Sequence, residues 1–474
     1  MRRTICLALL ALGMAGGLLA QEAATGSSPS NLLRFDEILA IVQQEHPIAK
    51  QADLKLIEGS AEVLRARGAF DPTALVKNSQ KELKDTEYYD EWSAVLEIPT
   101  WYGIELQMGF EDNTGEFLNP DQTVPDGGLY SAGISVSVLE GLLIDERRST
   151  LRQAQQYELQ TQAQRTQLIN QLIYDAGTAY LNWLETAREE DIYRNFVENA
   201  KVRLEGVSRA VQAGETAAID SVEAGIALQN RQLSLEAATL KRQKAALIMS
   251  NFLWSEGVPV QLAEDARPAL PLNEQWMLLL NIDPSAGLGN WLENHPKILE
   301  MDAKIQGLEV NQRYKKNKLL PELDVYYAFL NPEATPLSGY NTANYQAGLS
   351  FKLPLFLRKE RGEYQLAQQK LEVAQFENAA VRLGLVNKAD ANLLAIESLT
   401  RQKEQIVGIV SDYRRMMQAE ERKFELGESS LFLINTREAL LIRSELKANE
   451  LEIDQLGAYL DLFNVLGLET VANP

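Results

Sequence analysis

The sequence predicts an α+β membrane protein in which long α-helices pack as coiled coils and β-strands close into a transmembrane barrel by oligomerisation. Three observations lead to this fold class. One structural plan is written twice in the 474 residues, alternating apolar and polar residues mark several strands, and two proline-free helical stretches each run for 66 residues. Helices of that length cannot form a compact globule, so they must pack on each other or on other copies of the chain.

The chain begins with a predicted secretory signal peptide over residues 1–20. Arg2 and Arg3 precede an apolar run, and the small residue Ala20 marks the expected cleavage point. The only cysteine, Cys6, lies inside this segment, so we expect a mature chain without disulfides. No later stretch offers about 20 uninterrupted apolar residues, so no transmembrane helix is expected.

The composition argues against several function classes. With 46 Lys and Arg against 66 Asp and Glu, the chain lacks the basic face that a nucleic-acid partner requires. Two histidines and one cysteine lead us to expect no metal site, no cofactor site and no catalytic residues. Acidic pairs at residues 189–190 and 420–421 could serve as carboxylate dyads, but solvated faces of long helices account for them better. We therefore do not expect an enzyme.

Motif spacing reveals the repeat. His46-Pro47 recurs 249 positions later as His295-Pro296, whereas Gly214-Glu215 recurs 213 positions later as Gly427-Glu428. The first copy therefore carries 36 extra residues, all within residues 72–148. These spacings divide the mature chain into a first repeat over residues 21–254, a linker over 255–290 and a second repeat over 291–474.

Each copy opens with a helix and continues with strands. The helices follow the His-Pro motifs, over residues 48–67 and 297–318, where proline suits the first turn and the histidine is expected to act as a cap or junction residue. Apolar and polar residues then alternate along about four strands of the first copy and two of the second. The expected strands include residues 73–83, 91–99, 103–112 and 129–138 in the first copy and 345–353 in the second.

Two long helices complete each copy. Residues 148–213 and 361–426 contain no proline, and each stretch would span roughly 100 Å as a helix. Each ends at a glycine, Gly214 or Gly427, where a left-handed backbone turn costs little. Returning helices are expected over residues 218–253 and 431–466.

Two such copies behind a signal peptide resemble the TolC-type outer-membrane efflux protein family over nearly all of the mature chain. The resemblance rests on the order of the His-Pro motifs, the strands leading into long helices, and the glycine turns. It implies a homotrimer with a β-barrel in the outer membrane of a Gram-negative bacterium and a helical barrel across the periplasm. It also implies a periplasmic adaptor (membrane fusion) protein and an inner-membrane transporter as partners.

The residues themselves agree with a barrel built from several chains. Strands in a bilayer must close, because an open edge leaves backbone groups unpaired in lipid, and one chain offers too few strands for a pore. The family's common pattern has two strands per repeat, whereas the first copy here is expected to have four. A trimer would then have either 18 strands, or 12 strands with three long surface hairpins, and the sequence leaves both open.

The resemblance places functional residues at the far periplasmic end. It implies that the glycine turns form the tip and contact the adaptor, through Gly214, Glu215, Gly427 and Glu428.

A candidate gate follows the first turn. The acidic ring that narrows the family's pore would fall in the second copy on Leu433 and Thr436, which are not acidic, whereas the first copy keeps acidic residues at the matching positions, Asp220 and Glu223. Ser429 stands where the family has a basic linking residue. Asp220 and Glu223 share a helix face, so threefold symmetry would make rings of like charge. Alternatively, Asp220 only favours the start of its helix.

Basic side chains cluster where helices meet strands, at the predicted membrane rim. The cluster consists of Arg147, Arg148, Arg313, Lys315, Lys316, Lys318, Arg358 and Lys359, with Arg65, Arg67, Arg152 and Arg361 close in sequence. These residues either bind anionic headgroups of outer-membrane lipid or pair locally with nearby acidic residues.

The sequence leaves two possible functions open. The first is a passive export duct across outer membrane and periplasm, as part of a tripartite efflux or type I secretion system. The second is a periplasmic coiled-coil scaffold or adaptor without a pore, against which the strands with an apolar outer band argue.

Overall fold

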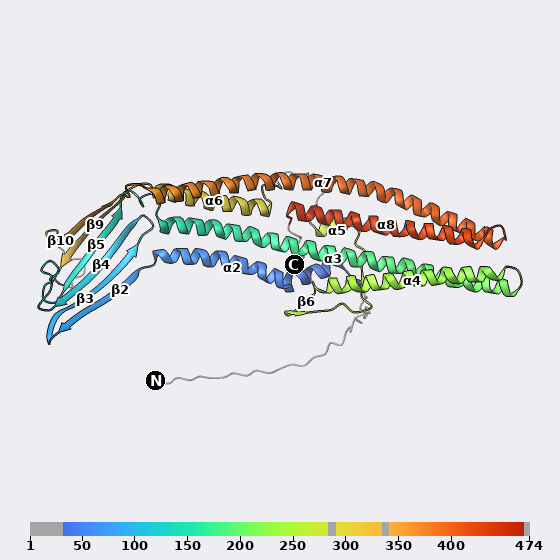
Figure 1. The fold of residues 1–474 in the computed structure, drawn as a ribbon, viewed down its shortest axis with the longest axis horizontal. Coiled ribbons are helices and arrows are strands. Elements are labelled where there is room, and N and C mark those ends of the chain that lie inside the picture. Colours follow the sequence, from blue (N-terminus) through green and yellow to red (C-terminus); the bar gives the residue numbers. More distant parts are fainter. Residues whose placement is uncertain (1–31, 283–290, 334–340, 469–474) are drawn as a thin grey trace, which may run out of the picture.

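The structure, a computed structural model, describes residues 32–282, 291–333 and 341–468. The predicted signal peptide lies outside the described residues. The chain forms an elongated body with a β-sheet at one end and two helical hairpins at the other (Figure 1). This arrangement agrees with the expected combination of long helices and strands.

The sheet contains six antiparallel strands from both halves of the chain, in the order β10-β9-β5-β4-β3-β2. The strands are β2 (Thr73–Leu83), β3 (Thr86–Pro99), β4 (Ile104–Thr114), β5 (Leu129–Ser137), β9 (Glu322–Asn331) and β10 (Tyr345–Lys352). The four strands expected in the first copy are confirmed, although β3 starts five residues earlier than expected. Within one chain, β2 and β10 are the sheet edges.

One face of the sheet is apolar across its whole width. The register aligns Leu96, Met108, Ala132, Phe329 and Tyr345 in one row, from β3 to β10. The neighbouring row on the same face holds Ile98, Leu106, Ile134, Tyr327 and Ala347. Several of these side chains are exposed, so this face has no covering layer within the chain. Alternation places polar side chains on the opposite face.

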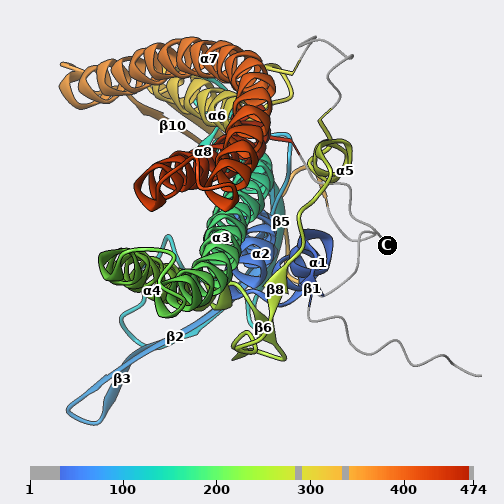
Figure 2. The same cartoon turned by 90° about the vertical axis from the view of Figure 1, so that its right-hand side faces the viewer.

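The helices form a single curved layer (Figure 2). Next to the sheet, α3 contacts α2 and α6, and α6 contacts α7; towards the other end, α3 pairs with α4 and α8 pairs with α7. The bounds are α2 (Pro47–Arg67), α3 (Glu146–Gln212), α4 (Ala218–Ser250), α6 (Pro296–Asn317), α7 (Arg358–Glu425) and α8 (Leu431–Leu466). These helices agree with the expected ones to within three residues at each end.

A compact core at mid-length holds the layer together. Trp276 of α5 (Asn273–Leu279) is fully buried against Phe35 of α1 (Phe35–Glu45), and its indole N–H donates to the Leu456 carbonyl at 3.0 Å. Tyr180 and Trp183 of α3 complete this aromatic cluster. Short strand pairs flank it, β1 (Leu32–Leu33) with β8 (Arg267–Pro268) and β6 (Trp254–Ser255) with β7 (Val258–Pro259).

Both histidines cap helices, as expected. His46 Nδ1 accepts from the Ile48 N–H at 3.2 Å at the start of α2, and His295 Nδ1 accepts from the Lys297 N–H at 3.0 Å at the start of α6. A proline follows each histidine in the first turn, so the two starts have the same construction.

Candidate functional site

The two hairpin turns at the end farthest from the sheet have the same geometry. Gly214 and Gly427 adopt φ values of 78° and 76°, the left-handed region that glycine tolerates. The next N–H, of Glu215 or Glu428, reaches back to the Ala210 carbonyl at 2.9 Å or the Lys423 carbonyl at 2.8 Å. Both turns are therefore Schellman caps, and both glutamates are exposed at the tip.

Asp220 and Glu223 follow the first turn but have different surroundings. Asp220 is partly exposed in the first turn of α4, where a negative charge favours the helix start. One turn later, Glu223 Oε1 accepts from Asn435 Nδ2 of α8 at 3.0 Å. Glu223 therefore links the two hairpins of one chain.

In the second hairpin, the polar side chains near the turn bond to other groups of the same hairpin. Ser429, at the position of the family's basic link, donates through its hydroxyl to Glu420 Oε1 at 2.5 Å. Arg437 approaches the other oxygen of Glu420 at 3.7 Å, and the Thr436 hydroxyl donates to the Phe432 carbonyl at 2.8 Å. These bonds stay within α7 and α8, so they stabilise the hairpin rather than bridge to the first.

A charge network that the sequence analysis did not identify joins the two hairpins near the tip. Glu438 of α8 is 1% exposed, and Arg203 of α3 donates to both its carboxylate oxygens at 3.2 Å. Arg231 of α4 lies 3.5 Å from Glu438, and Glu421 of α7 lies 3.7 Å from Arg203. We call these four residues the hairpin clamp. It connects four helices through one buried carboxylate.

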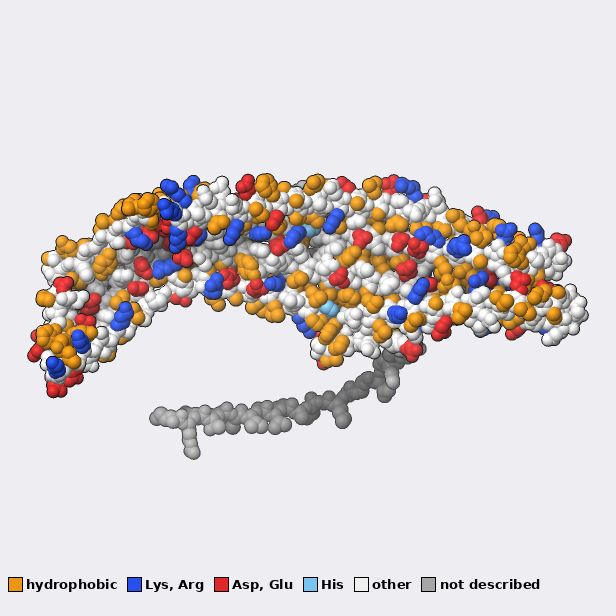
Figure 3. All heavy atoms as spheres, viewed as in Figure 1, with side chains coloured by type: hydrophobic (Ala, Val, Ile, Leu, Met, Phe, Trp, Pro, Cys, Tyr) orange, Lys and Arg blue, Asp and Glu red, His pale blue; other side chains and the backbone are white. Residues whose placement is uncertain are grey.

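The basic cluster lies where helices meet the sheet (Figure 3), and several of its members are paired. Arg148 donates to Asp145 at 3.1 Å and to the Leu142 carbonyl at 3.1 Å. Other ion pairs join Arg147 to Glu105, Arg313 to Glu309, Lys315 to Glu363 and Arg65 to Glu62. Local pairing therefore accounts for these members of the cluster.

Two other members lie beside aromatic rings. Lys318 lies 5.3 Å from the Tyr314 ring, and Arg358 lies 5.1 Å from the ring of Phe356, which is 71% exposed. Lys316 and Lys359 are exposed on the same level. These four cations are the part of the cluster best placed to meet a lipid surface.

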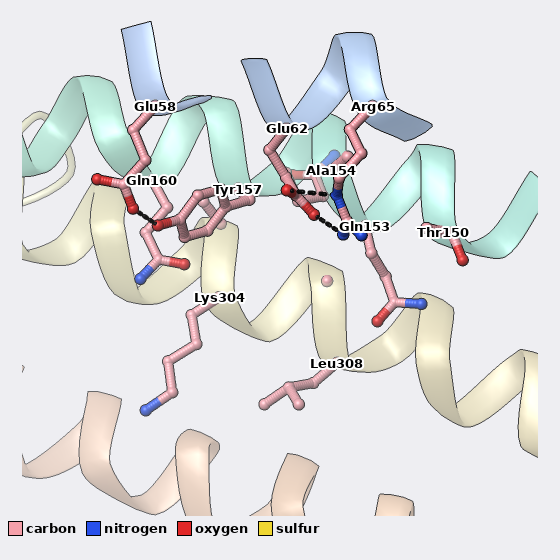
Figure 4. Close-up of a pocket in the computed structure, with 13 residues that line it drawn as sticks. Glu58, Glu62, Arg65, Thr150, Gln153, Ala154, Tyr157, Gln160, Lys304 and Leu308 are labelled. Atoms are coloured by element: carbon pink, nitrogen blue, oxygen red, sulfur yellow. Dashed lines mark hydrogen bonds and ion pairs between the residues drawn. The ribbon is translucent and has the colours of Figure 1, made fainter. Parts of the chain in front are cut away.

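An open groove of about 630 Å³ lies between α2, α3 and α6 (Figure 4). Glu58 accepts from the Tyr157 hydroxyl, and this bond raises the pKa of Tyr157 to about 12. Glu62 pairs with Arg65 beside them. The groove is open to solvent, and its two glutamates are engaged by Tyr157 and Arg65.

Within the described ranges, no group of His, Cys, Asp and Glu side chains could hold a metal ion. Of the helices that the structure describes, none is both long and apolar enough to cross a membrane.

Comparisons with known proteins agree with this architecture. Residues 287–468 match the family model described as outer membrane efflux protein. The pyoverdine export outer membrane protein OpmQ of Pseudomonas putida is 23% identical over 333 residues, which cover 69% of this chain and 67% of that protein. The CmeC outer membrane channel of Campylobacter jejuni and the open state of the Neisseria gonorrhoeae MtrE outer membrane channel share the fold. Each has a TM-score of 0.63, with identities of 11% and 14%, covering 92% of this chain and 86% and 89% of theirs.

Proposed function

We propose that the chain is a member of the outer membrane efflux protein family, whose model matches residues 287–468, and that three copies form a passive export duct through outer membrane and periplasm. In this proposal, sheets from three copies close a transmembrane barrel, and the helical layers close a second barrel below it. One observation carries the proposal. In the single chain, both edges of the sheet are strands with one unpaired side, and both edges of the helical layer are helices with exposed apolar side chains.

One edge of the helical layer is α4, which carries an exposed apolar stripe. Its members recur every seven residues, the spacing of a coiled-coil seam. They are Ile219, Ile226, Leu233, Leu240 and Leu247, each at least 52% exposed. Such a stripe is expected to pack against another helix, and none of the helices described for the same chain covers it.

The opposite edge is α7, which carries its own exposed apolar residues. They include Leu366, Val373, Phe376, Leu383 and Leu394. In the sheet, β2 and β10 are likewise edge strands, and both are exposed along their length. A second copy that brings its α4 and β2 edges to the α7 and β10 edges of the first would satisfy both layers at once.

The finer assignments are part of the same proposal. Residues 1–20 serve as signal peptide, residues 21–254 and 291–474 as the two repeats, and residues 255–290 as the linker at mid-length. The exposed turns at Gly214 and Gly427 are the surface offered to a periplasmic adaptor protein, which connects the duct to an inner-membrane transporter of a tripartite efflux or type I secretion system. In a periplasmic scaffold without a pore, the apolar face of the sheet would stay exposed to water, which is unfavourable.

Charging the α4 stripe tests closure. We expect the double variant Leu233→Asp, Leu240→Asp to lose the trimer, because it places six carboxylates in three apolar seams. The measurement is mass by light scattering or native mass spectrometry after detergent extraction. Gln232→Asp with Gln243→Asp adds the same charge beside the stripe and should leave the trimer intact. A stable trimer of the stripe variant would contradict this arrangement.

The exposed cations Lys316 and Lys359 at the rim give a second prediction. Reversing Lys316 and Lys359 to Glu should reduce trimer yield in bilayers rich in phosphatidylglycerol and have little effect in phosphatidylcholine, because each cation near an anionic surface contributes about 1 kcal/mol. Reversing Arg313, which pairs with Glu309, serves as the matched control. Equal yields in the two lipids would assign the cluster to local pairing alone.

The gate candidates give a third prediction. Replacing Asp220 and Glu223 with Ala should raise resting conductance and weaken block by divalent cations in planar bilayers, while trimer mass stays unchanged. The carboxylates would otherwise form rings that attract cations, and Glu223 also loses its bond to Asn435. Unchanged conductance and block would show that the constriction lies elsewhere.

A further inference from the structure

The first half of the chain has two strands without a counterpart in the second half. Both β2 and β9 follow the helix that begins at a His-Pro motif, α2 or α6, and both β5 and β10 precede the long helix. The remaining strands, β3 and β4, form what we call the inserted hairpin. In the sheet this hairpin lies between β2 and β5, rather than at an edge (Figure 1).

Continuous pairing holds the inserted hairpin in the sheet. On one side, β3 pairs with β2 from Thr73↔Glu97 to Leu83↔Thr86, with one irregularity after Lys81. On the other side, β4 pairs with β5 from Ile104↔Val136 to Glu111↔Leu129. Folding the hairpin out as a surface flap would break both ladders and require β2 to pair anew with β5.

The apolar face runs through the inserted hairpin without interruption. Trp92, Ala94, Leu96 and Ile98 of β3 pair with alternate residues of β4, whose apolar members continue the same face into β5. Trp92 is 50% exposed and Met108 is 52% exposed. A flap in water would leave this face solvated, whereas a transmembrane hairpin would place it in lipid.

The turn of the inserted hairpin lies at the helical end of the sheet. Trp101 stacks on Phe70, just beyond α2, with ring centroids 4.1 Å apart. A Cβ at Gly103 would lie 3.1 Å from a guanidinium nitrogen of Arg148, at the start of α3. The hairpin therefore spans the full height of the sheet, from the outer loops to the level of the basic cluster.

The polar face of the inserted hairpin is acidic. Glu91, Glu97, Glu105 and Glu111 occupy alternate positions on this face. The neighbouring strand β5 has neutral residues on this face, namely Leu129, Ser131, Gly133 and Ser135. The extra residues therefore add most of the negative charge to this face of the first-half strands.

We infer that the inserted hairpin crosses the membrane and lines the pore, so that a trimer has 18 barrel strands and carboxylates along the height of the pore, whereas β9 places Glu322 and Asp324 on this face only near the helical end. The inference rests on the proposed function.

The widths of the two layers are compatible with this strand number. Six strands about 4.8 Å apart and tilted by about 40° span about 38 Å of circumference, and four helices about 9.5 Å apart span the same width. The sheet and the helical layer can thus share one axis.

Cysteine labelling in cells distinguishes the two arrangements, because the only native cysteine, Cys6, lies in the predicted signal peptide. Thr100→Cys and Tyr102→Cys report on the turn of the inserted hairpin, and Asp121→Cys reports on the loop at the opposite end of the sheet. With a bulky membrane-impermeant maleimide, Asp121→Cys should react in intact cells. The two turn variants should react only after the outer membrane is permeabilised.

A second arm tests the lining in purified trimers. Gln107→Cys should react with water-soluble thiosulfonates, faster with a cationic than with an anionic reagent, and this preference should fall severalfold when Glu97→Gln and Glu105→Gln are added. Met108→Cys, on the other face, should react only with a lipid-soluble probe.

The outcomes separate this inference from the proposed function. Labelling of the turn variants in intact cells would assign the hairpin to the surface and leave a 12-stranded channel. Turn variants unreactive in both states would place the turn inside the bilayer and also overturn the inference, as would equal aqueous labelling at positions 107 and 108. Absence of Asp121→Cys labelling in intact cells would instead contradict the outer-membrane channel itself.

Discussion

Glu438→Ala is expected to open the periplasmic end of the channel. The substitution leaves Arg203 and Arg231, which are 11% and 17% exposed, without the carboxylate that both contact. Removing one partner of a buried ion pair costs about 3–5 kcal/mol, because the remaining charge stays desolvated. The substitution therefore destabilises the contact between the two hairpins of each chain. When the hairpins separate, both arginines become hydrated again, so the separated state is favoured.

The measurement is single-channel conductance of reconstituted trimers. If separation of the hairpins opens the tip, a change of about 3 kcal/mol shifts the ratio of open to closed channels roughly 100-fold. The variant Arg203→Met, Arg231→Met, Glu438→Leu replaces all three charges with apolar groups and should stay closed. Parent-like conductance of Glu438→Ala, in an intact trimer, would show that the hairpin clamp does not restrain the tip.

The helices, the glycine turns and the four first-half strands could be predicted because their signals are local. Period-two alternation marks a strand, and a missing proline followed by Gly214 or Gly427 marks a long helix and its end. The position of the inserted hairpin was also implicit in the repeat, since the 36 extra residues fall between β2 and the long helix. Its place in the middle of the sheet required the pairing itself.

The hairpin clamp could not be predicted, because its members lie far apart in sequence. Glu438 is separated from Arg203 by 235 positions and resembles any other charged residue of an exposed helix face. The same holds for the link from Asn435 to Glu223, which the family resemblance placed at a pore rather than between two hairpins. Charge pairing at this distance depends on the crossing of helices, which no local pattern encodes.

For the basic cluster, the location could be predicted from the sequence, but the different roles of its members could not. The sequence located it correctly at the junction of helices and sheet, but treated its members as equivalent. The structure divides them, because Arg148 fills its donors with Asp145 and backbone carbonyls, whereas Lys316 and Lys359 remain exposed. Rotamers and neighbouring carbonyls decide that division, and neither can be inferred from spacing.

His295 should make the stability of this protein depend on pH. The side chain is 6% exposed, and burial lowers its pKa from 6.5 to about 4. Between these values the unfolded chain binds a proton that the folded chain does not, so the free energy of unfolding falls as pH drops from about 6.5 to about 4. Below that range the folded protein is protonated as well, and the loss levels off.

The full shift corresponds to about 3 kcal/mol per chain, of which about 2 kcal/mol is lost by pH 5. Protonation also removes the lone pair on Nδ1 that accepts from the Lys297 N–H and caps α6. His295→Asn supplies a capping oxygen without a titrating ring, so it should flatten the difference in denaturant midpoint between pH 7 and pH 5, followed by helical circular dichroism. His46→Asn, at the cap of α2, removes a histidine whose pKa is lowered by less and should therefore flatten it less. If His295→Asn keeps the parent's pH dependence, other groups that titrate over the same range must be responsible.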